Sequence, residues 1–299
     1  MGKIFIPLRL YVSLFKQAAL AWNKDGADSM GAALAFYSAF SLAPLLLIVM
    51  ALAGVVYGPD RAREAVVRQF SALIGPVGAD AVGGLLKAAS TVETGLIATA
   101  VGVILLLVGA TTVLVELEND LDRIWEAPPR VGNGLISLLR VRLLSFSMIL
   151  GIGFLLIVSL VASSAIAAVS AHWNSSTIGA LGLFMADFAL SVVIFTALFG
   201  MLYKWLPNVR IEWNDVWTGA LTTAVLFNLG RLAIGVYLGR SATASAYAAA
   251  GSVLVLLLWL YYSAQIFLFG AEFTWARAKH RRALRQPRVP KPAEYQSPG

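Results

Sequence analysis

Long apolar runs separated by short polar segments dominate the chain. Six of these runs are uncharged or nearly so, and each reaches the length of about 20 residues that a helix needs to cross a bilayer. Because a chain in lipid must satisfy its own backbone hydrogen bonds, each run is predicted to be a helix. The six predicted spans cover residues 30–58, 94–115, 143–171, 178–203, 216–239 and 248–271.

The segments outside these runs complete the predicted organisation. Within residues 1–29, apolar side chains recur at three- and four-residue steps and would form a stripe on one side of a helix. This pattern is typical of an amphipathic helix lying in the membrane interface. The stripe consists of Ile4, Leu8, Tyr11, Phe15, Ala19 and Trp22. The loop 59–93 contains two shorter stripes, predicted as short amphipathic helices that either cap the outer mouth of the bundle or rest on the membrane surface. After the transmembrane domain of residues 30–275, residues 276–299 form a basic tail, predicted to be disordered from Gln286 onward.

Lys and Arg residues concentrate beside alternate ends of the predicted spans. Most of them lie in the N-terminal segment, in the loops after the second and fourth spans, and in the tail. Such residues favour the cytoplasmic side, so both termini are predicted to be cytoplasmic. The predicted fold class is therefore an all-α, polytopic membrane protein with six transmembrane helices.

Composition supports this class and excludes others. The 299 residues are 59% hydrophobic and only 13% charged, and their mean hydropathy is +0.78. A soluble domain has about 25% charged residues, so an ordinary cytosolic enzyme is excluded. The chain has no Cys and two His, which removes thiolate and iron–sulfur chemistry. We expect no cofactor, no metal site, no catalytic residue and no enzymatic activity. The net charge of +7 is explained by topology, so no nucleic-acid partner is expected.

Two ionisable residues lie inside predicted spans, where a charge is costly. Asp187 in the fourth span and Arg231 in the fifth are predicted at a similar depth, roughly 12–14 Å inside the outer boundary. Asn228 lies one turn before Arg231, on the same helix face. These three residues are the candidate substrate-binding site, which would contact an anionic head group or ion. The alternative is a neutralised pair that locks two helices, or an Arg231 side chain that snorkels outward.

Three further features have open interpretations. Pro44 leaves the Phe40 carbonyl without its helical donor, which predicts either a hinge or a fixed bend in the first span. Tyr261, Tyr262 and Gln265 are either interfacial anchors or side chains facing the interior. The acidic segment 116–125 (ELENDLDRIW) is compatible with metal or acid–base chemistry, although a solvated, salt-bridged helix end is the favoured interpretation.

Several segments together resemble the YihY/BrkB family. They are residues 35–44 (AFYSAFSLAP), 122–130 (DRIWEAPPR) and 258–272 (LWLYYSAQIFLFGAE). The resemblance covers about residues 10–280 and implies a bacterial inner-membrane protein with six helices. Members have been called virulence factors and once had the label ribonuclease BN, and some are linked genetically to lipid export. The family offers no agreed catalytic residues.

Three functions follow from these observations. The first is a transporter or flippase-like protein for an anionic or lipidic substrate in envelope biogenesis, whose partners would be membrane lipids such as an anionic phospholipid or a glycolipid. The second is an envelope scaffold that transports nothing. The third is a ribonuclease BN-type tRNA-processing enzyme. It is disfavoured because phosphodiester cleavage needs a metal cluster or an acid–base pair near a nucleic-acid groove.

Overall fold

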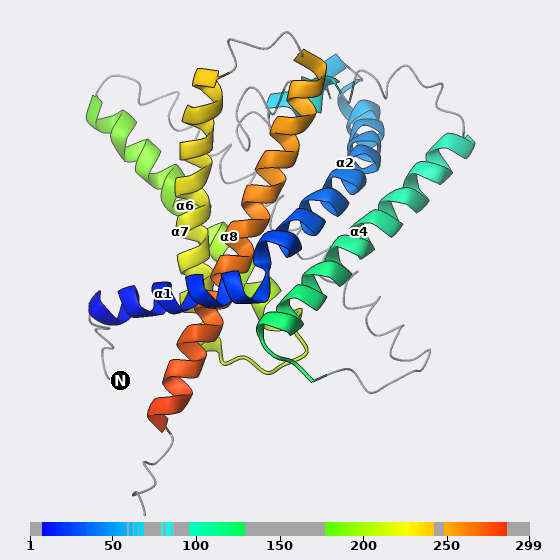
Figure 1. Ribbon diagram of the computed structural model, residues 1–299. Helices are drawn as coiled ribbons and strands as arrows, with labels where there is room; N and C mark the ends of the chain where they lie inside the picture. Colours follow the sequence, from blue (N-terminus) through cyan, green and yellow to red (C-terminus); the bar gives the residue numbers. More distant parts are fainter. Residues whose placement is uncertain are drawn as a thin grey trace, which may run out of the picture.

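Figure 1 shows the computed structural model, which describes residues 8–58, 60–61, 63–64, 66–68, 79, 82–84, 86, 96–128, 177–241 and 248–285. The regular elements of these residues are α-helices, so the all-α prediction is confirmed for this part of the chain. They are α1 (Leu8–Asp25), α2 (Ala27–Tyr57), α4 (Leu96–Ile124), α6 (Thr177–Trp205), α7 (Trp213–Ser241) and α8 (Ala248–Arg285). The predicted span 143–171 and the tail from Gln286 onward lie outside the described residues.

Each of the other five predicted spans falls largely within one long helix. α4 continues past residue 115 to Ile124, and α8 continues past residue 271 to Arg285, because their charged ends remain helical after the apolar run stops. Among the described residues, Phe188–Trp205 and Leu256–Arg285 are long and apolar enough to cross a membrane. The number of spans and their orientation stay predictions. α2 runs through Pro44 without interruption, but that side chain lies outside the described residues, so the hinge also stays a prediction.

α8 is the central helix of the bundle. It packs against α2 on one side and α7 on the other, and α1 crosses it (Figure 1). α2 pairs with α4, and α6 pairs with α7 through the short loop 206–212. The end of the bundle at which α1 lies, here called the α1 end, also contains the last turns of α4 and α6 and the first turn of α7. The five long helices are thus two pairs joined through α8.

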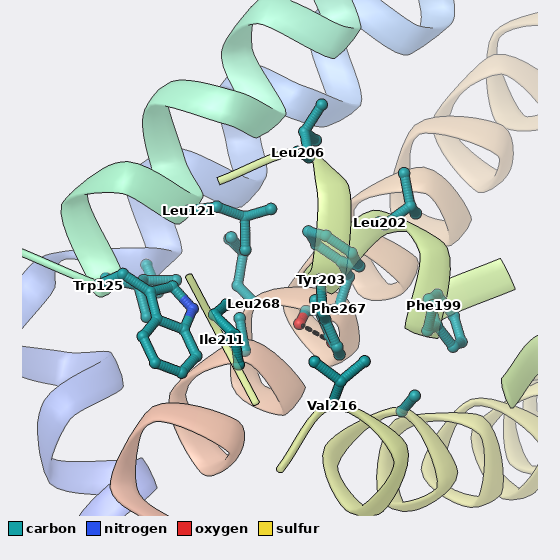
Figure 2. Close-up of a cluster of buried hydrophobic side chains, with 14 of the residues drawn as sticks. Leu121, Trp125, Phe199, Leu202, Tyr203, Leu206, Ile211, Val216, Phe267 and Leu268 are labelled. Carbon is teal, nitrogen blue, oxygen red and sulfur yellow. Dashed lines mark hydrogen bonds between the residues drawn. The ribbon is translucent and has the colours of Figure 1, made fainter. Parts of the chain in front are cut away.

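The largest buried cluster lies at the α1 end, where all these helices converge (Figure 2). Leu121 of α4 and Trp125, which directly follows α4, meet Tyr203 of α6, Ile211 of the connecting loop and Phe267 of α8. The rings of Tyr203 and Phe267 lie 5.1 Å apart, within the range of favourable aromatic contacts. This cluster anchors the bundle at one end.

A row of tryptophans marks the same end on the outside. Trp205, Trp213 and Trp217 are each about half exposed, and successive rings in the row are 6.0 Å apart. Lys204 Nζ lies 5.1 Å from the centre of the Trp213 ring. Exposed tryptophan beside lysine is typical of the head-group layer of a membrane, which indicates that the α1 end lies at that level.

α1 is amphipathic as predicted, but its apolar stripe has two functions. Leu14 and Ala18 are buried against Phe273 and Ala276 of α8, so one edge of the stripe packs inside the protein. The other edge, which includes Ala19, is more exposed. At Gly26, with φ of 70°, the chain turns from α1 into α2; this left-handed conformation strongly favours glycine.

Described residues of the loop after α2 contact the bundle. Val66, Val82 and Leu86 are buried and form a cluster with Leu256 of α8, against which Leu42 of α2 also packs. The described side chains of this loop thus pack against α8 and α2; the two short amphipathic helices and their position stay predictions.

Four glycines lie beneath a polar side chain of a neighbouring helix, at points where the helices approach closely. A methyl group added to Gly270 of α8 would overlap the hydroxyls of Thr223 and Tyr203. The same relation joins Gly31 to Gln265, Gly219 to Thr274 and Gly230 to Tyr262. Small residues let membrane helices approach until their polar groups meet, without a hydrophobic driving force between them.

The glycine contacts give a first prediction. We expect Gly270→Ala to lower the free energy of unfolding by about 1–3 kcal/mol, the usual effect of overpacking. Gly182→Ala in α6 is the matched control, because no atom of the described residues lies within 4 Å of the added methyl group; it should be neutral or slightly stabilising, since alanine favours helix. Thermal unfolding of the purified protein in detergent measures both. Equal melting temperatures for the two variants would contradict the close approach at Gly270.

Candidate functional site: a polar seam along α7

Asn228 is the best-defined of the three predicted site residues. Its side chain is 0% exposed and lies between α6 and α7. Asn228 Oδ1 accepts a hydrogen bond of 2.7 Å from the Ser191 hydroxyl of α6, and Nδ2 donates one of 2.9 Å to the Ala224 carbonyl. A buried amide is costly unless its groups are paired, and here both ends of the amide are paired.

The Ser191–Asn228 hydrogen bond also fixes the register of the antiparallel helices α6 and α7. Asp187 lies four residues before Ser191, and Arg231 lies three residues after Asn228, so both backbone positions are about one turn further from the α1 end. The Arg231 side chain is partly exposed, whereas the Asp187 side chain lies outside the described residues. An ion pair between Asp187 and Arg231 therefore stays a prediction, and the register is compatible with it.

Towards the α1 end, the polar contacts continue at Thr223. Tyr203 of α6 is completely buried, and its hydroxyl donates a hydrogen bond of 2.7 Å to the Phe267 carbonyl of α8 (Figure 2). The same hydroxyl lies 3.1 Å from Thr223 Oγ1. Thr223 Oγ1 donates to the Gly219 carbonyl at 2.8 Å. One buried tyrosine hydroxyl thus joins α6, α7 and α8.

Ion pairs lie at the α1 end of the same α7 face. Asp215, only 2% exposed, is 2.7 Å from Arg281 and 3.4 Å from Arg277 of α8. Burial raises the pKa of the Asp215 carboxyl, and Arg281 and Arg277 oppose that effect. Glu212 pairs with Arg281 and Arg285. Charged side chains are thus held together at the head-group level of the bundle.

These polar and small residues on the buried side of α7 are here called the α7 seam: Asp215, Gly219, Thr223, Asn228 and Arg231. The first three follow one another at four-residue steps on the side that faces α8, whereas Asn228 faces Ser191 of α6 and lies further round the helix. At 1.5 Å per residue the seam is about 24 Å long. From Gly219 to Asn228 it is packed closed between α6, α7 and α8. Hydroxyl, amide and charged groups are the kinds of group that can form hydrogen bonds with a polar ligand.

An apolar groove of about 470 Å³ lies beside the α7 seam, between α1, α7 and α8. It is lined by Phe15, Ala19, Trp22, Leu226, Tyr262, Gln265, Ile266 and Phe269. Gln265 accepts a hydrogen bond of 3.0 Å from Trp22 Nε1 and donates one of 3.1 Å to the Ala27 carbonyl. The Tyr262 hydroxyl lies over Gly230, on the side of α7 that faces α8 and at the depth of Asn228 and Arg231 along the helix. The groove therefore reaches α7 at the depth of these two polar residues.

The acidic end of α4 differs from its favoured interpretation. Glu118 and Asp120 are 6% and 5% exposed, so a solvated helix end is wrong for these two side chains, which the converging helices cover. Burial, assisted by the nearby charge of Glu116, raises the pKa of Asp120 to about 7. Asp122 Oδ1 accepts a hydrogen bond of 2.6 Å from the Asn208 backbone N–H. Within the described residues, no group of three or more His, Cys, Asp or Glu could hold a metal ion.

Comparison with known proteins identifies the family. The profile of the virulence factor BrkB family matches residues 18–294, nearly the whole chain. The chain belongs to the virulence factor BrkB family. A UPF0761 membrane protein of Pseudomonas paraeruginosa is 30% identical over 89% of this chain and 64% of its own length. A UPF0761 membrane protein of Neisseria meningitidis is 27% identical over 87% and 63%.

The chain thus spans about two thirds or less of the length of these curated BrkB relatives. No solved structure matches it. Together with its composition and its apolar helices, the family membership shows that the chain is a membrane protein.

The segments that resemble the BrkB family have identifiable structural functions. Asp122 holds the loop between α6 and α7, and Ile124 and Trp125 are buried in the largest cluster. Glu272 is 0% exposed and lies near Lys24 and Asp25 at the corner between α1 and α2. Sequence reasoning gave Glu272 no function; its only signal was a carboxylate next to an apolar run. These segments hold the α1 end together.

The raised pKa of Asp120 gives a second prediction. Its folded-state pKa of about 7 lies above the unfolded value, so the folded protein binds an extra proton between these values and loses stability as pH rises through that window. Asp120→Asn should therefore reduce the fall in melting temperature between pH 5 and pH 8. Glu64→Gln, which alters an exposed carboxylate, should leave that fall unchanged. Equal pH dependence in wild type and Asp120→Asn would contradict the buried protonated state.

Proposed function

We propose that this membrane protein moves an anionic or lipidic substrate across the bacterial inner membrane, in the manner of a flippase. The observation that supports the proposal is that the apolar groove reaches α7 at Tyr262, at the depth of the polar residues Asn228 and Arg231. A lipid has an apolar and a polar part, and this arrangement offers a separate surface to each. The proposed activity is binding and movement rather than catalysis.

The energetics of a head group explain why a buried polar seam suits this function. A charged group at the bilayer centre costs at least about 2.5–3.5 kcal/mol on insertion scales. Hydroxyl and amide groups spaced along α7 would replace part of the lost water, while the acyl chains remain in the groove or the surrounding lipid. Since the seam is packed closed from Gly219 to Asn228, movement requires α7 to separate from α8, which exposes Gly219 and Thr223, and from α6, which exposes Asn228.

Contacts between α7 and α8 suit such a separation. Gly219 and Gly230 of α7 meet single hydroxyl groups of α8, and Gly270 of α8 meets one of α7. Contacts of this kind are shallow, and the Thr223 and Thr274 hydroxyls already donate to carbonyls of their own helices. They can therefore remain hydrogen-bonded when the helices part. The resemblance to the YihY/BrkB family, some of whose members are linked genetically to lipid export, also supports a function in lipid movement.

Lipid movement in reconstituted vesicles tests the proposal. The vesicles contain fluorescent phosphatidylglycerol, phosphatidylethanolamine or a lipid A-type glycolipid, and the exposed label is destroyed chemically. We expect protein-dependent movement of at least one lipid, which Tyr262→Phe slows at least fivefold because the hydroxyl that faces α7 is lost. Tyr261→Phe is the matched control and should move the lipid at the wild-type rate.

Two results would overturn the proposal. The absence of protein-dependent movement for all three lipids would favour the envelope scaffold, especially if a stoichiometric partner co-purified with the chain. Equal rates of lipid movement for Tyr261→Phe and Tyr262→Phe would show that the lipid does not pass the Tyr262 hydroxyl.

A charge exchange tests whether the α7 seam extends to Arg231. Asp187→Arg and Arg231→Asp should each lower the yield of folded protein, because each leaves an unpaired charge. The double variant should restore the folded yield but not lipid movement, since a substrate would meet reversed charges. Size-exclusion chromatography measures the yield, and the vesicle assay measures movement. If movement recovers with folding, the pair is structural and the functional seam ends at Asn228.

A further inference from the structure

Basic side chains in the last turns of α8 lie on two faces of the helix. One face, with Arg277, Arg281 and Arg285, is turned towards α7, where ion pairs with Asp215 and Glu212 occupy it. These arginines follow one another at four-residue steps, so they form one stripe on the helix. Their charge is already neutralised by the protein itself.

The other face, with Lys279 and Arg282, is turned towards the end of α4. Among the described side chains, neither residue forms an ion pair with a carboxylate. Lys279 Nζ lies 4.3 Å from the centre of the Trp275 ring, and Arg282 is exposed. Both cations are therefore available to an anion from outside the protein.

Lys279 and Arg282 line a cavity of about 540 Å³ between α8 and the end of α4. Its full lining is Trp125, Glu126, Trp275, Ala278, Lys279, Arg282 and Ala283. The volume falls within the usual range of about 300–1,000 Å³ for small-molecule sites. Two tryptophans and two alanines supply apolar walls, so the cavity suits a ligand that is partly apolar and has one anionic group.

We propose that this cavity binds the phosphodiester group of an anionic phospholipid. The guanidinium of Arg282 can bind two phosphate oxygens at once, and Lys279 adds a second positive charge. Glu126 on the opposite wall leaves the lining with a single net positive charge, which matches a singly charged phosphodiester and disfavours a doubly charged phosphomonoester. The α1 end lies at the head-group level, as the tryptophan row indicates.

This inference rests on the proposed function for its biological meaning, because it names an anionic lipid and a place where one is held. Binding at the cavity is nevertheless independent of movement. The cavity lies at α4 and the end of α8, whereas the groove lies between α1, α7 and α8. The binding experiment can therefore succeed where the vesicle experiment fails, and the reverse.

Lipid binding to the full chain in detergent micelles tests the inference. Native mass spectrometry measures the affinity for phosphatidylglycerol and for phosphatidylcholine with the same acyl chains. We expect wild type to prefer phosphatidylglycerol at least tenfold, and Lys279→Gln with Arg282→Gln to remove that preference. The matched control, Arg9→Gln with Lys16→Gln, removes two exposed charges from α1 and should change the affinity less than twofold. Equal losses in both double variants would overturn the proposal in favour of general surface charge.

Two further arms identify the ligand chemistry. The deacylated head group glycerophosphoglycerol should bind at least tenfold more weakly than phosphatidylglycerol; equal affinity would overturn the assignment to a lipid and indicate a soluble phosphate. Glu126→Gln should raise the affinity for phosphatidic acid, a phosphomonoester, more than that for phosphatidylglycerol. An equal rise for both lipids would contradict selection by Glu126. Since none of these substitutions lies in the groove or the α7 seam, lipid movement in vesicles should continue in every variant.

Discussion

Polar groups that are buried among apolar helices must find partners inside the protein, and this constraint organises the bundle around α8. The buried groups of Asp215, Thr223 and Asn228 on α7 each face a partner on α6 or α8, and glycines provide room where helices approach closely. In lipid there is little hydrophobic drive between helices, so close packing and such contacts select which helices meet. The register of α6, α7 and α8 is therefore set by polar residues, although most residues of these helices are apolar.

The same contacts connect the fold to its proposed function. The polar groups of the α7 seam stabilise the bundle while they are paired with one another. In the proposed function, the same groups would form hydrogen bonds with a lipid head group, in place of water, when the helices separate. The arrangement at the α1 end is different, because there the ion pairs of Asp215 and Glu212 hold α7 to α8 outside the apolar region. One end of the α7–α8 contact is thus fastened more firmly than the other.

Most of the helices could be predicted from the apolar runs, because a run of about 20 uncharged residues in a membrane can satisfy its backbone hydrogen bonds only as a helix. Asn228 was found for the same reason: an amide within such a run is conspicuous. Glu118 and Asp120 were assigned to solvent, since a sequence of alternating carboxylates does not reveal that other helices cover it. The separation of Lys279 from Arg281 could not be predicted either. Helical periodicity places them on different faces, but only the position of α7 shows which face is neutralised.

The hydrogen bonds of Gln265 to Trp22 and to the Ala27 carbonyl join residues more than two hundred positions apart. During translation the corner between α1 and α2 emerges from the ribosome long before α8 exists. The corner between α1 and α2 therefore lacks these hydrogen bonds until α8 has been made. A nascent chain that stops before α8 would thus leave the first helices unfastened, which makes such fragments natural targets for membrane quality-control proteases.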